Sequence, residues 1–500
     1  MSISFNTTPS DTRVPLFWAE MDNSQANTAI ADQPSLIIGH ALPDSAMTLN
    51  TMTLVSNIGE FKQQAGRGSQ LARMAAAYRD VDTTGTLWAI AIPVGSGAVA
   101  ASCEITIGGS AISPGVISLY IGRQRVQVGV SAGDDPEDVI ANIVTAINDN
   151  PDLPVSAVVD GTTIVVLRAK NPGLWGNEIP VSINYYSSVG GETTPEGLTV
   201  SISTMSGAVG APDLTAAMAA FGDEAGDFIA CPFNDSTSLA SMANAMNDTS
   251  GRWAPGRQSY GHVYSAKFGS LSSLQAYGVT LNQQHITLSG VEEKNQTCVD
   301  ELAALSAARN AVFIRNDPAR PTQTGELNGA LPAPAGARFD RTGQGTLLKS
   351  GIATFYAQAG AMFIQRAITT YQKNKFGDAD NSYLDSETLH TSAYVLRQLK
   401  LCITSKYPRH KLANDGTRYG GGQAIVTPST IKAEMCAQYR QMELAGIVEN
   451  FELFKKYLIV ERDRNDPNRV NVLFPPDYIN QLRVFAVINQ FRLQYAEEAA

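Results

Sequence analysis

Hydrophobic and polar residues alternate along the end of the chain. One face of this segment carries five apolar residues, Phe485, Val487, Phe491, Leu493 and Tyr495. The pattern predicts a strand that enters a core and leaves it along a surface. Residues 482–488, apolar on both faces, either complete a sheet of their own domain or pair elsewhere. Residues 489–495 favour pairing with another subunit, because an unpaired strand edge is a template for a second chain.

The start of the chain also has the pattern of an extended arm. Pro9 and Pro15 argue against a helix there, because proline lacks an amide donor and restricts the residue before it. Ile3 and Phe5 alternate with polar residues, which is typical of a short strand. The sequence therefore predicts two terminal arms, residues 1–20 and residues 481–500.

Strand and helix patterns alternate over residues 21–94 and again over residues 207–345. Such alternation is the signature of a parallel sheet covered by helices on both faces. Apolar spacing over residues 61–81 predicts one helix in the first stretch. We expect the two stretches to form one α/β domain.

The intervening residues 95–206 have a different composition, rich in Gly, Val, Ile, Ser and Thr. Turn residues divide them into short strands, and one helix begins near Pro136. We expect a β-rich domain inserted into the α/β domain. It should face outward, because insertions are tolerated at exposed sites.

The pattern of residues 346–480, after the α/β domain, predicts a C-terminal α+β domain. Its expected elements are a hairpin with its turn at Ala359–Gly360, helices over 382–407 and 428–446, and strands over 450–462 and 469–475. Residues 316–340, rich in Pro and Gly, predict a linker or a long ordered loop between the two domains.

The composition indicates a folded protein and argues against a nucleic-acid-binding or membrane-spanning one. Charged residues make up 17% and hydrophobic residues 44%, which is typical of a folded chain with a sizeable core. The net charge of −10 argues against direct binding to nucleic acid, which needs clustered Lys and Arg. No stretch approaches the roughly 20 apolar residues of a membrane span. Five Cys without a CxxC pair indicate reduced thiols in a protein made in a cytoplasm, and no export signal is evident.

The sequence gives little support for catalysis, a cofactor or a metal site. None of the five His has metal-ligand spacing, and no G-x-S-x-G motif is present. Residues 378–389 resemble a calcium loop, but Tyr383 and Leu389 replace its glycine and glutamate. Two glycines within residues 64–72 lack the spacing of a phosphate-binding loop. We therefore expect no catalytic, cofactor-binding or metal-binding residue.

Several stretches spread over nearly the whole chain resemble the tail sheath proteins of Mu-like contractile phages, in the same order. They are TRVPLFWAEMDNSQA, GRGSQLARMAAAYR, LYIGRQRVQVGV, AKNPGLWGNEIPVSINYY, DFIACPFND, NDPARPTQTGEL, RAITTYQKN, YPRHKLANDGTRYGGGQAIVTP and LAGIVEN. No single stretch is a chemical motif, but the ordered set is specific.

This resemblance implies a structural protein of the virion, assembled in the host cytoplasm. Identical subunits would form a helical sheath of stacked hexameric rings around a tail tube, with baseplate and tail terminator proteins as further partners. Contraction would drive the tube through the host envelope to deliver the genome. The resemblance also implies that the α/β domain has a subtilisin-like shape without protease activity.

The resemblance gives the two arms a role. Arms of neighbouring subunits would complete a small shared sheet, which places Ile3 and Phe5 beside the apolar face of residues 485–495. Two alternatives remain. The chain could form the sheath of a phage-derived bacteriocin or another contractile injection system. A more remote alternative is an α/β hydrolase that uses His262, supported by fold-level analogy alone.

Overall fold

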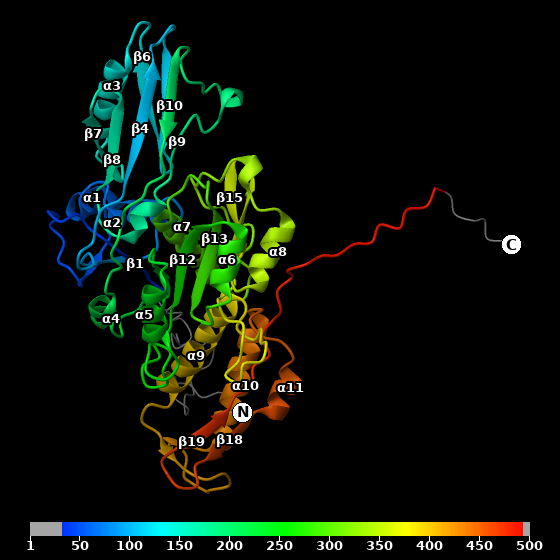
Figure 1. The fold of residues 1–500 in the computed structure, drawn as a ribbon. Helices are drawn as coiled ribbons and strands as arrows, with labels where there is room; N and C mark the ends of the chain where they lie inside the picture. Colours follow the sequence, from blue (N-terminus) through cyan, green and yellow to red (C-terminus); the bar gives the residue numbers. More distant parts are fainter. Residues whose placement is uncertain (1–32, 494–500) are drawn as a thin grey trace, which may run out of the picture. The chain divides into compact units, whose positions relative to one another are not determined.

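The computed structural model describes residues 33–493. An eight-stranded sheet, called the main sheet below, has the strand order β15-β14-β13-β12-β11-β1-β3-β2 (Figure 1). Its strands are β1 (Ser35–Gly39), β2 (Met52–Leu54), β3 (Leu87–Ala91), β11 (Phe228–Ala230), β12 (His262–Gly269), β13 (Ile286–Glu292), β14 (Ala353–Gln358) and β15 (Ala361–Arg366). Strands from β14 to β3 run parallel, and the outermost pairs are antiparallel.

Helices cover both faces of the main sheet, as predicted. One face carries α1 (Ile58–Ala65), α2 (Gln70–Arg79) and α7 (Val299–Asn316), and the other carries α4 (Thr215–Phe221), α5 (Ser236–Met246), α6 (Leu271–Gly278) and α8 (Arg341–Lys349). Successive residues of β1 point to opposite faces: Leu36 and Ile38 pack in one hydrophobic cluster and Ile37 in the other. All three side chains are buried, which explains why this strand is apolar without interruption.

The single helix expected over residues 61–81 is wrong, because the chain forms α1 and α2 with a tight connection between them. Gly66 and Gly68 have φ of 85° and 81°, a conformation that ends a helix. Ser69 then caps α2 by accepting a hydrogen bond from the Ala72 amide.

The hairpin predicted around Ala359–Gly360 forms, with its turn at these residues, as β14 and β15. The prediction placed this hairpin in the C-terminal domain, but β14 pairs in parallel with β13 and so extends the main sheet. The physical reason is burial: Phe355 and Ile364 join the hydrophobic cluster beneath α7.

The β-rich stretch forms two smaller sheets and one helix, α3 (Pro136–Asn148). Their orders are β10-β4-β8-β7 and β6-β5-β9. The strands are β4 (Ser102–Gly109), β5 (Gly115–Ile121), β6 (Gln124–Val130), β7 (Val155–Asp160), β8 (Ile164–Ala169), β9 (Val181–Ile183) and β10 (Leu198–Ile202); the 3₁₀ turns are η1 (Leu174–Glu178) and η2 (Ser188–Gly190). Asp135 caps α3 and exchanges hydrogen bonds with Asp138, so the predicted start near Pro136 is confirmed.

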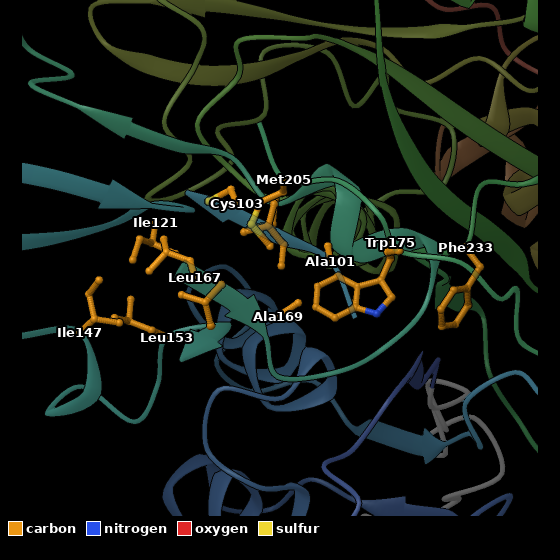
Figure 2. Packing of buried hydrophobic residues seen from close by; sticks show 14 of the residues in the cluster. Ala101, Cys103, Ile121, Ile147, Leu153, Leu167, Ala169, Trp175, Met205 and Phe233 are labelled. Carbon is orange, nitrogen blue, oxygen red and sulfur yellow. The ribbon is translucent and has the colours of Figure 1, made fainter. Parts of the chain in front are cut away.

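The hydrophobic core continues from the β-rich stretch to the main sheet. Figure 2 shows Trp175 of η1 beside Ala101 and Ala169, with Phe233 on its far side. All four belong to one cluster that also includes Ile38 of β1. The two regions therefore share buried apolar packing rather than a flexible tether alone.

The remaining elements follow the main sheet. They are α9 (Ser386–Lys406), α10 (Pro428–Leu444), α11 (Phe451–Tyr457), the pair β16 (Lys411–Leu412) and β17 (Ile425–Val426), and the hairpin β18 (Ile459–Arg462) and β19 (Val470–Leu473). The strand expected over residues 450–462 is wrong in its first half, which forms α11. Phe451 and Phe454, three residues apart, both contact Tyr439 of α10, and only a helix brings them to one side.

Residues 316–340 are an ordered loop rather than a flexible linker. Apart from the short turn η3 (Ala335–Ala337), it has no helix or strand after α7 ends. Thr322, Leu327 and Ala333 are nonetheless buried. This loop packs along the edge of the main sheet, where the Thr324 amide donates to the Ile364 carbonyl at 2.8 Å.

Candidate assembly surface

The segment after β19 lacks the strand predicted from its alternating pattern. Its described part, residues 474–493, has one isolated bridge, between Tyr478 and Val448, and no ladder. The alternative in which residues 482–488 complete a sheet of their own domain is therefore wrong for this subunit. Within the described chain, the edges of the main sheet are formed by β2 and β15, and this segment pairs with neither.

The apolar side chains of this segment are exposed. The exposed fractions lie between 68% and 96% for Phe485, Val487, Phe491 and Leu493. Three of the predicted assembly residues, Ile3, Phe5 and Tyr495, lie outside the described residues. A row of large apolar side chains in water is unusual for a monomer and makes this segment a candidate interaction surface. We call residues 484–493 the assembly arm.

The residues just before the assembly arm are bound to the rest of the chain. The Ile479 amide donates to the Ile447 carbonyl at 3.2 Å, and Gln481 Nε2 donates to the Ala319 carbonyl at 2.9 Å. Gln323 Nε2 donates to the Leu482 carbonyl at 3.2 Å. We call residues 477–483 the arm root.

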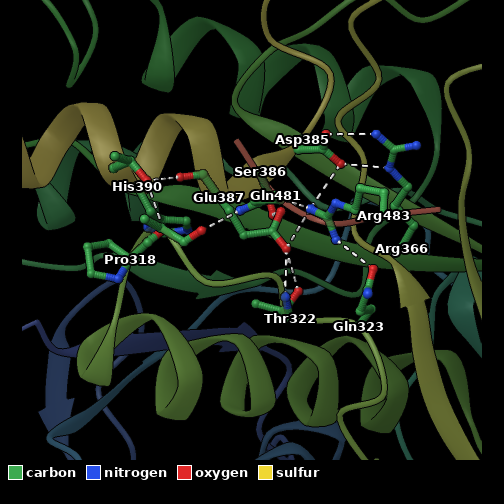
Figure 3. A network of polar contacts seen from close by, with 12 residues as sticks. Pro318, Thr322, Gln323, Arg366, Asp385, Ser386, Glu387, His390, Gln481 and Arg483 are labelled. Carbon is green, nitrogen blue, oxygen red and sulfur yellow. Dashed lines mark hydrogen bonds and ion pairs between the residues drawn. The ribbon is translucent and has the colours of Figure 1, made fainter. Parts of the chain in front are cut away.

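Arg483 ends the arm root and enters a nearly buried polar network (Figure 3). Its guanidinium lies 3.2 Å from Asp385 Oδ1 and 3.1 Å from Glu387 Oε1, and only 11% of its side chain is exposed. It also donates to Gln323 Oε1 at 3.3 Å. Two carboxylates thus face one cation, an arrangement in which partly buried charges compensate each other.

The two carboxylates are held from the other side by the main-sheet region. Glu387 is fully buried and accepts hydrogen bonds from the Thr322 amide and hydroxyl at 2.9 and 2.8 Å. Asp385 forms a bidentate pair with Arg366 at the end of β15, with both distances 2.8 Å. The network therefore joins the arm root, the start of α9 and the edge of the main sheet.

Sequence reasoning missed this network. Asp385 belongs to the stretch that resembles a calcium loop, but it pairs with arginines instead. In the part of the chain that the structure describes, no group of three or more His, Cys, Asp and Glu side chains could hold a metal ion. Only the unusual Arg483 within an otherwise apolar stretch of residues 482–488 hinted at a specific partner.

A second exposed apolar surface lies on the β18–β19 hairpin. Ile459, Val472 and Leu473 are each more than two-fifths exposed. Within residues 33–493, each of the two strands pairs only with the other. An unpaired strand edge is a template for another chain, and this hairpin offers two such edges.

His262, the residue of the hydrolase alternative, lies in the core. Its Nε2 is 2.8 Å from Thr287 Oγ1, and its ring contacts Tyr264 and His390. Burial holds the pKa of His262 well below its ordinary value, and the nearby His390 and His285 act in the same direction. A fully buried neutral imidazole on β12 is a structural residue rather than an accessible base.

Comparisons with known proteins place most of the chain in two known domains. Residues 207–370 match the phage tail sheath protein central domain, and residues 378–492 match the phage tail sheath C-terminal domain. The β14–β15 hairpin lies within the first match. No helix in residues 33–493 has the length and apolar character needed to cross a membrane.

The chain is 38% identical over 496 residues to the Mu-like prophage FluMu tail sheath protein of Haemophilus influenzae, covering 99% of this chain and 100% of that protein. Two solved sheath tail proteins are also similar. That of Desulfitobacterium hafniense has a TM-score of 0.46 at 12% identity, covering 93% of this chain and 100% of its own. That of Listeria innocua has a TM-score of 0.47 at 11% identity, covering 90% of this chain and 92% of its own. The full-length identity and the two matched domains show that the chain belongs to the phage tail sheath protein family.

Proposed function

We propose that the chain is the repeating subunit of a contractile tail sheath that polymerises helically around a tail tube. The observation that carries this proposal is the assembly arm, whose large apolar side chains are exposed in the isolated subunit. Family membership supports it. A contact between two different surfaces of identical subunits continues without closing and so generates a helical polymer.

The proposed contact is strand addition. The assembly arm of one subunit, with Ile3 and Phe5 of another, would complete a small sheet on the β18–β19 hairpin of a neighbour. Each added ladder hydrogen bond contributes a net of about 0.5–1.5 kcal/mol. Burial of the apolar face against Ile459 and Leu473 adds to this. Residues 484–493 alone span up to about 36 Å when extended, which would be enough to reach an adjacent subunit.

Contraction in this proposal requires two lattices of different free energy, not chemistry within the subunit. The α/β region would then have a subtilisin-like shape without catalytic work, and the buried position of His262 supports a protein that is not an enzyme. The subunits would assemble into stacked hexameric rings. The proposed partners are a tail tube, a baseplate and a tail terminator, with no direct contact to nucleic acid and no membrane insertion.

The proposal also assigns places to the regions of the subunit. Residues 95–206 face outward, and the C-terminal region with the arms holds neighbours together. The domain limits at residues 95, 207, 346 and 481 stay predictions. The mature protein would reside in the virion after assembly in the host cytoplasm. A sheath of a genome-free injection device is the second candidate, and a neighbouring capsid gene would distinguish a phage from it.

Negative-stain electron microscopy of the purified chain tests the proposal. We expect hollow rods or stacked rings from the full chain. A chain truncated before Asn489 should stay folded, by circular dichroism, but form no ordered polymer. Phe491→Asp, on the apolar face, should also abolish polymers, whereas Gln490→Glu on the opposite face should not. Normal rods from the truncated chain would contradict the arm model.

A further inference from the structure

Arg483 lies where the C-terminal segment changes from bound to exposed. Before it, residues 477–482 make hydrogen bonds to the body through both main-chain and side-chain atoms. After it, Val484, Phe485 and Val487 are all more than two-thirds exposed. The direction in which the assembly arm leaves the subunit is therefore fixed at this residue.

The groups that hold Arg483 belong to the main-sheet side of the molecule rather than to the β18–β19 hairpin. Gln323 and Thr322 lie in the loop that hydrogen-bonds to β15, through Thr324 and Ile364. Asp385 is itself held by Arg366 at the end of β15. The Arg483 side chain thus connects the base of the assembly arm to the edge of the main sheet.

We propose that Arg483 is a positioning residue for assembly, which fixes the arm root to the main sheet so that the arm is presented in one direction. This inference rests on the proposed function and deepens it. Without the Arg483 contacts, residues 477–483 would be held only by their remaining hydrogen bonds and would open more often. Strand addition would then have to order more of the chain. The conformational entropy lost in that ordering opposes association and lowers the affinity between subunits.

A double substitution, Arg483→Met with Glu387→Gln, tests the proposal without leaving a buried charge unpaired. The glutamine carbonyl can still accept the hydrogen bonds from Thr322, so the subunit should fold. Arg483→Lys provides a second variant, since it keeps the charge but loses the fork that contacts Asp385, Glu387 and Gln323 together. Arg257→Met with Asp223→Asn removes an exposed ion pair elsewhere and is the matched control.

Two measurements are needed on each variant. Hydrogen exchange of the monomer should become about tenfold faster in peptides covering residues 477–483 of the double variant, and stay unchanged in β18–β19. Sedimentation should show that the concentration needed for polymerisation rises about tenfold. In both measurements, the lysine variant should give values between those of the wild type and the double variant. The control should have the exchange rate and the polymerisation threshold of the wild type.

The outcomes separate this inference from the proposed function. Unchanged exchange of the arm root, or faster exchange with an unchanged polymerisation threshold, would overturn the role of Arg483. Failure of the unmodified chain to polymerise under any condition would count against the proposed function instead. The exchange measurement on the monomer does not depend on polymerisation, so it tests the anchor in either case.

Discussion

Arg73 of α2 and Asp300 of α7 form an ion pair almost completely withdrawn from water, with 4% and 0% of their side chains exposed. Arg73 Nη1 lies 3.2 Å from Asp300 Oδ1 and 3.6 Å from Glu301 Oε1. The Arg73 guanidinium also lies over the ring of Trp175, at 5.5 Å. This pair therefore links two helices of the main-sheet region to the beginning of the η1 turn, where the β-rich stretch returns.

Removing one partner of this pair should destabilise the fold strongly. Arg73→Met leaves Asp300 as a buried, unpaired charge, and we expect a loss of about 3–5 kcal/mol of unfolding free energy. Urea unfolding of the monomer measures it. Arg257→Met, in the exposed pair with Asp223, is the control and should change stability by less than about 1 kcal/mol. Similar effects of the two substitutions would contradict the importance of burial.

Replacing Gly68 should destabilise the fold, both because its φ is positive and because the β-rich stretch packs directly against it. A Cβ at this position would lie 2.2 Å from the Leu153 carbonyl and 2.6 Å from the Pro151 carbonyl, both in the β-rich stretch. Gly68→Ala should therefore separate α2 from this stretch, and we expect a lower melting temperature. Gly133 has a similar φ, 93°, with open space around it.

Gly133→Ala thus isolates the backbone cost, about 1–2 kcal/mol for a left-handed alanine. The melting temperature of Gly68→Ala should fall clearly below that of Gly133→Ala. Equal melting temperatures would mean that the contact with residues 151–153 relaxes without cost.

Elements with a strong local pattern could be predicted from the sequence. The α3 helix has Asp135, Pro136 and a regular apolar face, and each of these signals depends on near neighbours alone. The turn at Ala359–Gly360 was predictable for the same reason. The sheet that its hairpin joins was not, because β14 pairs with β13, whose partner residue Ser289 lies far back in the chain.

The candidate site was predictable only in part. Alternation identified Phe485, Val487, Phe491 and Leu493 as one face, and their exposure agrees with an intermolecular role. The same alternation left open whether residues 482–488 pair within the subunit or elsewhere, since a period of two says nothing about which chain supplies the partner. Arg483 and Glu387 are distant in sequence, and no local pattern connects them.

Glu178 should make stability depend on pH near neutrality. It ends η1 and accepts a hydrogen bond from Asn234 at 2.9 Å. Burial raises the pKa of Glu178 to about 7, against the opposing effects of Lys267 and Asn234. Between its ordinary pKa and about 7, the folded state binds a proton that the unfolded state releases. The contribution of Glu178 to stability therefore falls as pH rises through this window.

The expected slope is no steeper than about 1.4 kcal/mol per pH unit, the value for one proton. Glu178→Gln removes the group and should flatten the difference between pH 5 and pH 7 relative to the wild type. Urea midpoints measured across this range provide the comparison. Parallel pH profiles for the two proteins would show that Glu178 titrates as an ordinary carboxyl.

The β18–β19 hairpin should depend on aromatic packing beneath it. Tyr439 of α10 and Phe454 of α11 stack with ring centroids 3.7 Å apart and an interplanar angle of 10°, and both are buried. The Tyr439 hydroxyl donates to the Glu449 carbonyl at 2.6 Å, which fixes the turn into α11. Because α11 leads directly into β18, loss of this stack should loosen the hairpin as well as α11.

Phe454→Ala should therefore cost about 3–5 kcal/mol, as for other buried aromatic side chains. Leu453→Ala, at a neighbouring position that is 53% exposed, should stay within about 0.5 kcal/mol. Denaturant unfolding gives both values, and hydrogen exchange in residues 459–473 reports the hairpin. Faster exchange there in Phe454→Ala alone is the expected result. Protected amides despite the lost ring would mean that the hairpin is stable independently of α11, and that its conformation does not depend on the α10–α11 contact.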